Sequence, residues 1–309
     1  MALYRFKDGE AVGAGRTPFC FLDGAHRHRG AHVQWFGDAI DTLSAQQAIA
    51  SNKAAWNESA EHHKATEHWQ SLLADVGAPD FSCLDPTLTT LLMQVGVKGR
   101  DAVQLGCNNG RESLSLYGLG ASSVVGVDQS DAFLAQAAEL ASRSPHAPEF
   151  IEADIHHLPE RLQGRFDIAL ITIGVLGWMP DIGLFMGHVA STLKDGGTLV
   201  IYETHPILEV FDPEAPNPML PVTSYFRREP FVQHEAIVYE GPSNSAAAAS
   251  YWFVHTLGEV VSAAIAAGLQ ISHLQEYPHS NREELYDQYE NQPAQLPMCY
   301  TLTAVKRPA

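Results

Sequence analysis

A loop of small residues followed by an acidic residue is the part of this chain best suited to bind a ligand. Residues 101–130 read DAVQLGCNNGRESLSLYGLGASSVVGVDQS, where Gly106, Asn108 and Gly110 separate an apolar run from a predicted helix. Small residues let the backbone approach a ligand closely, and a new helix offers free N–H groups. Asp128 directly follows a second apolar run and can accept hydrogen bonds from both hydroxyls of a ribose. The segment therefore predicts a nucleoside site.

The same loop is a poor match for a phosphate site. It lacks the G-x-G-x-x-G and G-K-[ST] patterns, and Glu112 just inside the helix would repel a pyrophosphate. Asn108 tolerates left-handed backbone angles better than most residues do. A simple turn, with Asp128 as a helix cap, is the alternative. The strand before Asp128 favours a ribose-binding role for this residue, and the loop favours a nucleoside that is cationic or zwitterionic.

A carboxylate and an imidazole end a later apolar run, in the sequence YETHP. Glu203 and His205 lie two residues apart and would point the same way from an extended strand. Such a pair can position a nucleophile or remove its proton, so we expect both to be catalytic. The alternative is a hydrogen-bonded anchor for the segment that follows. A free amine or ring nitrogen would need no strong base, whereas a hydroxyl would make His205 the candidate base.

The elements that must position these residues alternate between strand and helix. Alternation of this kind predicts a parallel sheet with helices on both faces and ligands at the carboxyl ends of the strands. The expected fold is α/β, a Rossmann-like doubly wound sheet of seven strands, mostly parallel with an antiparallel closing strand. The expected strands are 101–105, 123–127, 149–152, 166–173, 198–202, 270–276 and 298–305, and the expected helices are 44–73, 81–93, 131–142, 181–193 and 256–267.

Two segments stand outside this alternation. Residues 1–43 are rich in Gly, His and Arg and are expected to form an N-terminal extension, an arm or lid, before a domain at 44–309. Residues 207–254 hold a proline cluster and aromatic runs, which predict an inserted substrate cap of two or three antiparallel strands. Tyr225 and Trp252 in this cap, with His255 after it, are candidate substrate residues.

The ordered motifs resemble the class I S-adenosylmethionine-dependent methyltransferases, and in particular a bacterial subgroup that acts on small molecules. The first motif of that family is an acidic residue followed by G-x-G-x-G, with another acid closing the second strand. Gln104 and Asn108 depart from this pattern at the first acid and the middle glycine. The resemblance covers roughly residues 48 to 305 and rests on NKAAWNESAEHH, VKGRDAVQLGCNNGRESLSLYGLGA, GVDQS, ADIHHLP, GRFDIALITIGVLGWMPD, LKDGGTLVIYETHP and HTLGEVVSAAIAAGLQI.

The resemblance implies S-adenosyl-L-methionine as the methyl donor and S-adenosyl-L-homocysteine as the product. It implies that Gln129 packs on the adenine, that Asp154 lies near the adenine amino group and that Ile155 lies against the ring. Ile173 would flank the methionine part. Trp56 lies on a helix that folds over the cofactor in related enzymes. For Trp56 and Asp154, packing and exposure are the alternatives.

Composition restricts the partners of the protein. A net charge of -17 argues against nucleic acid and anionic membranes, and the hydrophobic fraction of 45% is ordinary for a globular protein. The four cysteines form no C-x-x-C pair, and no apolar signal core or membrane-length run is visible. We expect a cytoplasmic protein with a small-molecule acceptor and no nucleic-acid or membrane partner, and a homodimer is possible.

A metal site is not expected. His26, His28 and His32 share a basic loop without acidic or cysteine partners at convincing spacing. The sequence thus predicts a methyltransferase that acts on N or O of a small metabolite. Two alternatives remain: a catalytically silent protein that binds S-adenosylmethionine or a nucleoside in a regulatory role, and an NAD-dependent oxidoreductase, against which the loop spacing argues.

Overall fold

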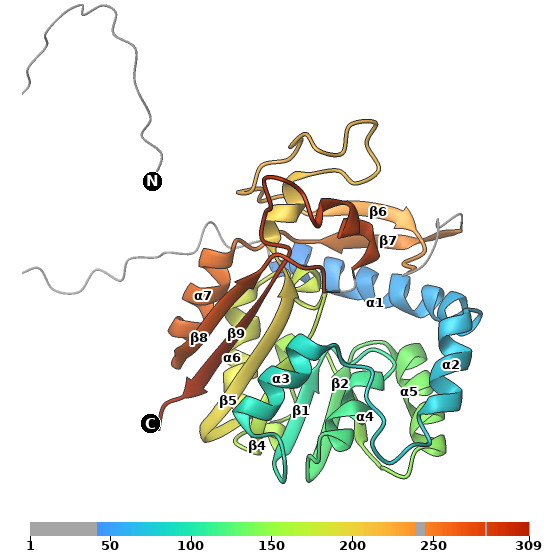
Figure 1. The fold of residues 1–309 in the computed structure, drawn as a ribbon, viewed down its shortest axis with the longest axis vertical. Coiled ribbons are helices and arrows are strands. Elements are labelled where there is room, and N and C mark those ends of the chain that lie inside the picture. The colour runs from blue at the N-terminus through green and yellow to red at the C-terminus, as the bar shows by residue number, and fades with distance from the viewer. Residues whose placement is uncertain (1–41, 239–244, 282, 309) are drawn as a thin grey trace, which may run out of the picture. The chain divides into compact units, whose positions relative to one another are not determined.

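A seven-stranded sheet forms the centre of the computed structural model, which describes residues 42–238, 245–281 and 283–308. The strand order is β3-β2-β1-β4-β5-β9-β8. Pairing is parallel from β3 to β5, and β9 runs antiparallel to both its neighbours. This confirms the expected doubly wound sheet with one antiparallel closing strand (Figure 1). The strands are β1 (Asp101–Leu105), β2 (Ser123–Asp128), β3 (Glu149–Glu152), β4 (Phe166–Ile171), β5 (Leu193–Thr204), β8 (Leu269–Tyr277) and β9 (Cys299–Lys306).

Helices cover both faces of this sheet. On one face, side chains of β1, β2, β4 and β5 pack with α6 and α7, and on the other they pack with α3 and α4. The period of two within β1 explains the division, because Val103 and Leu105 belong to the first cluster and Ala102 to the second. The helices are α1 (Thr42–Lys64), α2 (Glu67–Asp75), α3 (Pro86–Val95), α4 (Arg111–Gly118), α5 (Asp131–Arg143), α6 (Ile182–Thr192) and α7 (Leu257–Ala266).

Helix α1 is tied to a separate two-stranded sheet, made by β6 (Phe231–Glu235) and β7 (Ala246–Trp252). Asn52 on α1 donates to the Tyr251 carbonyl at 3.0 Å and accepts from its N–H at 2.7 Å. Ser59 likewise accepts from the N–H of Ile237 at 2.9 Å. Polar side chains of α1 thus form hydrogen bonds with backbone groups at the hairpin that a third strand could otherwise have paired with. Figure 1 shows α1 between the hairpin and the main sheet.

Some element boundaries differ from the sequence prediction for local reasons. The helix expected at 44–73 is two helices, because Thr66 caps α2 by accepting from Trp69 N. The helix expected within 81–93, with its opening near Asp85 and Pro86, does begin at Pro86 after its cap Asp85, and it extends to Val95. Strand β5 is longer than expected and begins at Leu193.

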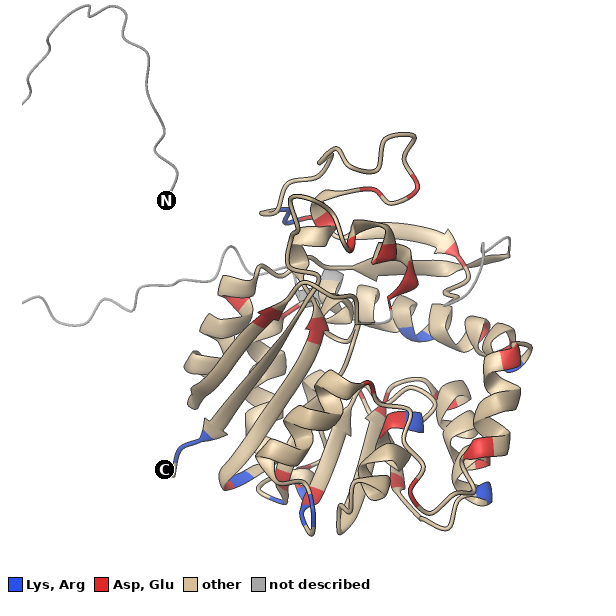
Figure 2. Cartoon of the chain, viewed as in Figure 1, with Lys and Arg blue, Asp and Glu red and all other residues tan. Residues whose placement is uncertain are grey.

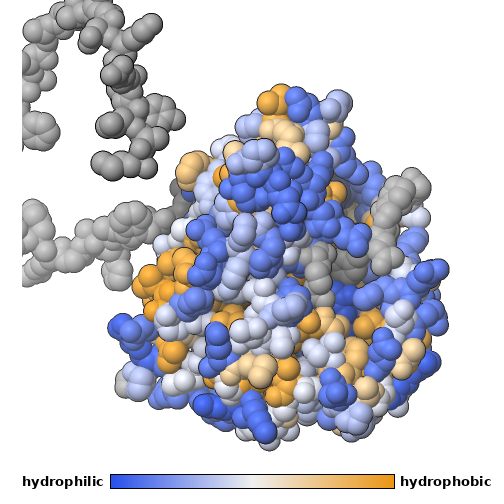
Figure 3. Space-filling view, in the orientation of Figure 1, coloured by the Kyte–Doolittle hydropathy of each residue, from blue (hydrophilic) through white to orange (hydrophobic). Residues whose placement is uncertain are grey.

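Short 3₁₀ turns lie at the ends of several strands and carry residues of interest. They are η1 (Ile155–His157), η2 (Glu160–Leu162), η3 (Leu176–Trp178), η4 (Pro206–Val210) and η5 (Glu284–Tyr289). Of the extension predicted over residues 1–43, residues 1–41 with their three histidines lie outside the described residues, and Thr42 and Leu43 belong to α1. Among the helices that are described, none has the length and apolar character needed to cross a membrane. Figure 3 shows apolar side chains gathered over α7, where Ile265 is exposed.

Candidate functional site

A pocket lies at the carboxyl ends of β1, β2, β3 and β4, as the doubly wound topology predicts. Its walls come from the loop after β1, the tip of β2, the turn η1, the loop after β4, and helix α1. Of the residues predicted to bind a cofactor, all except Gly110 line it. The lining residues are Ile49, Trp56, Gly106, Cys107, Asn108, Asn109, Arg111, Glu112, Asp128, Gln129, Asp154, Ile155, His156, Thr172, Ile173, Gly174, Val175, Trp178 and Met179.

The loop after β1 needs its small residues. Gly106, Asn108 and Gly110 all have left-handed backbone angles, with φ of 75°, 49° and 74°. A Cβ on Gly106 would lie 2.6 Å from a methyl carbon of Val175, and one on Gly110 would lie 2.5 Å from the Phe150 ring. Gly106 therefore lets the loop after β1 approach Val175 in the loop after β4. Gly110 precedes α4, packs against Phe150 and does not line the pocket.

Asp128 both fixes this loop and faces the pocket. Its Oδ2 accepts from Asn108 N at 2.7 Å, and its Oδ1 accepts from Ser130 N at 2.9 Å. Burial raises the pKa of Asp128, and these backbone donors oppose the rise. Each carboxylate oxygen has a second lone pair, so Asp128 can still accept from the hydroxyls of a ribose.

The turn η1 changes the role expected for Asp154. Its Oδ1 accepts from His156 N at 2.9 Å and lies 2.9 Å from His156 Nδ1, while its Oδ2 lies 3.0 Å from His157 Nδ1. Burial alone would raise the pKa of Asp154, but the hydrogen bonds from His156 and His157 outweigh this effect and lower it. Asp154 thus caps η1 and orients two imidazoles.

His156 is the polar group at this wall that sequence reasoning missed. It lines the pocket with 3% of its surface exposed, and its buried Nε2 has no hydrogen-bond partner in the described part of the chain. Because Nδ1 faces the Asp154 carboxylate, the neutral ring carries its proton there and leaves Nε2 as an acceptor. An unpaired buried acceptor fits a ligand amine, such as the amino group of adenine.

The loop after β4 forms the next wall and is held from behind by Glu203. Ile173, Val175 and Trp178 line the pocket, whereas Glu203 does not. Its Oε1 accepts from Gly174 N at 2.6 Å and Oε2 from Leu176 N at 3.4 Å. Burial raises the pKa of Glu203 to about 8, against the effect of these donors. The carboxyl anchors the loop.

His205 is also outside the pocket lining. Strand β5 ends at Thr204, and His205 caps η4 by accepting from Ile207 N at Nδ1, over 3.1 Å. Its Nε2 lies 2.9 Å from Oε1 of Glu276 on β8. Both ring nitrogens face the protein itself, so the expected presentation of Glu203 and His205 to an acceptor is not what the fold provides. The anchor considered as their alternative role matches this geometry.

None of the three predicted substrate residues lines the pocket, and two of them, Trp252 and His255, contact lining residues from outside. Trp252 contacts Trp178 edge-on at 5.0 Å between ring centroids, and Trp178 contacts Trp56 at 5.3 Å. His255 Nε2 donates to the Met179 carbonyl at 2.7 Å. Tyr225 accepts from Leu257 N at 3.0 Å, at the start of α7. Trp56 and Trp178 are therefore the aromatic rings that reach the pocket.

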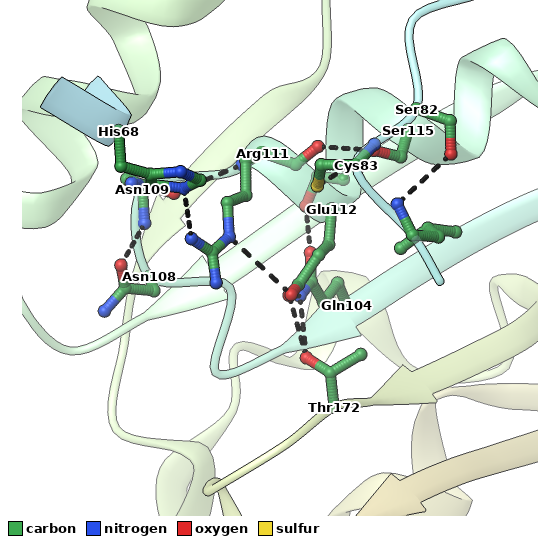
Figure 4. A network of polar contacts seen from close by, with 12 residues as sticks. His68, Ser82, Cys83, Gln104, Asn108, Asn109, Arg111, Glu112, Ser115 and Thr172 are labelled. Carbon is green, nitrogen blue, oxygen red and sulfur yellow. Dashed lines mark hydrogen bonds and ion pairs between the residues drawn. The ribbon is translucent and has the colours of Figure 1, made fainter. Parts of the chain in front are cut away.

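A polar network closes the floor of the pocket between β1, α4 and β4. Figure 4 shows Gln104, Glu112 and Thr172 joined through the Glu112 carboxylate, with Arg111 and His68 beyond it. Glu112 and Arg111 are pocket residues that the sequence did not identify as binding groups. No cluster of three or more metal-ligating side chains exists among the residues described.

Comparisons with known proteins agree with this arrangement. Residues 103–201 match the family model described as a methyltransferase domain. Over 108 residues the chain is 33% identical to a tRNA U34 carboxymethyltransferase of Pseudomonas aeruginosa (strain UCBPP-PA14), covering 35% of this chain and 33% of that protein. The chain thus spans about a third of the length of that curated relative.

Solved structures match more of the chain at lower identity. A Burkholderia thailandensis 1,6-didemethyltoxoflavin-N1-methyltransferase, with S-adenosylhomocysteine bound, aligns over 88% of this chain and 98% of its own, with 15% identity and a TM-score of 0.51. The cyclase SpnF aligns over 83% and 97%, with 17% identity and a TM-score of 0.53. The chain therefore carries a methyltransferase domain at residues 103–201, and its strand order is that of the fold shared with these solved structures.

Proposed function

We propose that this protein transfers a methyl group from S-adenosylmethionine to a small-molecule acceptor, through nitrogen in preference to oxygen. The observation that carries the proposal is the pocket at the strand ends, which is lined by Asp128, with lone pairs left on its carboxylate, and by His156, whose buried Nε2 has no hydrogen-bond partner among the described residues. These groups match a ribose diol and an adenine amine in one continuous cavity. The orphaned Nε2 of His156 is the feature that a bound adenosyl group fits best.

The residues of the chain have mainly binding and orienting roles. Asp128 would hold the ribose, His156 and Ile155 the adenine, and Ile173 and Trp56 the apolar stretch between adenosine and sulfur. S-adenosylmethionine supplies a methyl group already activated by its sulfonium. The protein then needs to hold donor and acceptor in line and to exclude water, which its aromatic wall at Trp56 and Trp178 favours.

Nitrogen is favoured because Glu203 and His205, the candidate bases at the β5 end, do not line the pocket. Glu203 accepts from backbone N–H groups, and His205 accepts from Ile207 N while its Nε2 lies close to the Glu276 carboxylate. An amine or ring nitrogen needs no proton removed before attack, whereas a hydroxyl does. We therefore propose that Glu203 and His205 position the walls of the acceptor site rather than exchange protons with the acceptor.

Charge favours a small acceptor over a nucleic acid, although a curated relative is named for a tRNA. Residues 207–254 hold six acidic and two basic residues. Figure 2 shows acidic residues along the segments around the hairpin. A tRNA backbone would instead need lysine or arginine side chains to neutralise its phosphates. An acceptor that is neutral or cationic is compatible with this charge.

A silent binding role is the second candidate, and the internal bonding of Glu203 and His205 favours it. A fold of this kind does not by itself fix the reaction, since a neighbour in structure is named a cyclase. This candidate predicts tight S-adenosylmethionine binding without methyl transfer to any acceptor.

Calorimetric titration with S-adenosylmethionine, S-adenosylhomocysteine and NAD tests the proposal. Binding of both adenosyl ligands and not NAD is expected. A screen of amines and heterocycles for radiolabelled methyl transfer follows, with phenols and unmodified tRNA as comparison acceptors. Absence of adenosyl binding would overturn the proposal. Binding with no transfer would favour the silent role, and transfer to tRNA would overturn the choice of acceptor.

A further inference from the structure

One carboxylate in the pocket lining, that of Glu112, comes from a helix and not from the end of a strand. Gln104, at the end of β1, is fully buried and does not line the pocket. Its amide is neutral, so the strand itself presents no charge to a ligand. The carboxylate comes instead from Glu112, in the first turn of α4, which lines the pocket with 9% of its surface exposed.

Gln104 holds this carboxylate in a fixed orientation. Ser113 Oγ donates to Gln104 Oε1 at 2.6 Å, which leaves the amide nitrogen to donate. That nitrogen lies 2.8 Å from Glu112 Oε2, and Thr172 Oγ donates to the same oxygen at 2.9 Å. A buried carboxylate with two neutral donors on one oxygen is well located, because each bond restricts its rotation.

The second oxygen of Glu112 is available to a ligand. Among the described residues, the contact of Oε1 is with Arg111 Nε, at 3.8 Å, which is beyond hydrogen-bonding distance. The start of a helix stabilises a carboxylate through the helix dipole. Glu112 therefore presents an anionic acceptor in a pocket wall, where a cationic ligand group would pair with it.

The sheet places Glu112 at the right end of the pocket for such a group. Strand β1 lies between β2 and β4, so Asp128 at the β2 tip and Thr172 after β4 lie on opposite sides of β1. Glu112 is bonded to Thr172. A nucleoside whose ribose contacts Asp128 and whose chain crosses the end of β1 would bring its far end to Glu112.

We propose that Glu112 binds the α-ammonium of the amino-acid end of the cofactor, with Gln104 and Thr172 as positioning residues. This rests on the proposed function, since it assumes an adenosyl amino acid in the pocket. In this chain the negative charge comes from Glu112 on α4, which the Gln104 amide holds in place. An acidic residue at position 104 of β1 would have provided that charge directly. The competing view is that Glu112 only stabilises the junction between β1 and α4.

Two ligands separate these views, because 5′-methylthioadenosine shares the adenosyl thioether of S-adenosylhomocysteine and lacks its amino-acid end. Glu112→Gln is expected to weaken S-adenosylhomocysteine binding by about 10- to 100-fold, the effect of losing one charged hydrogen bond. Binding of 5′-methylthioadenosine should be unchanged. Thr172→Val should cause a smaller loss, again confined to S-adenosylhomocysteine.

Glu67→Gln is the matched control, because Glu67 also lies in the first turn of a helix, is exposed and is not part of the pocket. Neither ligand should respond to it. Equal losses for both ligands in Glu112→Gln, or no loss for either, would overturn the proposal and leave the junction role. If the unaltered protein binds neither ligand, it is the proposed function that fails. Retained 5′-methylthioadenosine binding also shows that the variant is folded.

Discussion

The strand ends β1 to β3 and the strand end of β5 use their buried polar groups in opposite ways. At the first, Asp128, Glu112 and His156 all line the pocket, are each oriented by hydrogen bonds within the protein, and each keep acceptor capacity. At the second, Glu203 and His205 accept from backbone N–H groups and face other side chains. Both groups are costly to bury, since each loses its hydration.

The difference shows why a buried titratable residue is an ambiguous sign of catalysis. A raised pKa follows from burial alone, as for Glu203, whether or not a substrate is near. The decisive property is the direction of the remaining lone pair. Variants at the β1–β3 ends should therefore change ligand affinity, and variants at the β5 end should change stability.

The largest effect is expected from Glu203→Gln on the pH dependence of stability. With a folded pKa of about 8 against an ordinary value of 4.5, the native carboxyl keeps its proton while the unfolded one loses it. The contribution of Glu203 to the free energy of unfolding is therefore complete at pH below 4.5, falls as the pH rises, and is lost above about pH 8. The change amounts to on the order of 4 kcal/mol.

Denaturant-induced unfolding, measured across this pH range, should show that the free energy of unfolding of Glu203→Gln no longer declines as the pH rises. Glu235→Gln, on an exposed part of β6, is the control and should keep it. A variant curve parallel to that of the unaltered protein would mean that Glu203 is ionised in the fold. It would then resemble the groups at the β1–β3 ends more closely than we infer.

Asp128→Ala should weaken S-adenosylhomocysteine binding by about 100-fold, or about 3 kcal/mol, since two ribose hydrogen bonds and the loop contact to Asn108 are lost. Asp131→Ala, three residues on and exposed, should bind normally. Titration calorimetry measures both. Undiminished affinity in Asp128→Ala would place the ribose elsewhere.

His205→Ala should lower the free energy of unfolding by about 1–3 kcal/mol, because the cap of η4 and the contact with Glu276 disappear. S-adenosylhomocysteine affinity should not change. Turnover, measured well below the melting temperature, should fall little. A large loss of turnover with normal stability would instead restore His205 as the base that the sequence indicated.

The smallest effect is expected from His156→Phe, about a tenfold loss of S-adenosylhomocysteine affinity through one neutral hydrogen bond. His157→Phe is matched to it, because His157 contacts the same Asp154 but is 69% exposed. S-inosylhomocysteine, which lacks the amino group of adenine, should bind both variants alike. Equal effects of the two substitutions on S-adenosylhomocysteine would show that only the Asp154 contact matters.

The fold and the place of Asp128 in the pocket were predictable because their determinants are local. Alternating apolar runs define the parallel strands, and the left-handed angle at Asn108 follows from its residue type and place in the loop. Asp128 follows its strand directly, so the position of its carboxylate depends on one strand tip and one loop. Neither inference requires knowledge of distant contacts.

The roles of Asp154, Glu203 and His205 depended on contacts that spacing does not specify. Two residues apart on a strand share a face only while the strand continues, and β5 ends between Glu203 and His205. Asp154 lines the pocket as expected of a ligand contact, and the turn after it also brings two histidines onto its carboxylate. Trp252 and His255 likewise contact residues of the wall from outside the lining, and Tyr225 contacts the start of α7.

The sequence by itself determined the sheet, the loop after β1 and the place of the pocket at the strand ends, because hydrophobic period and backbone preference act within a few residues. Only the tertiary structure decided which polar atoms remain free. A buried donor or acceptor bonds to whatever the packed chain brings within about 3 Å. Those partners, such as Glu276 for His205 and Gln104 for Glu112, come from other strands and helices.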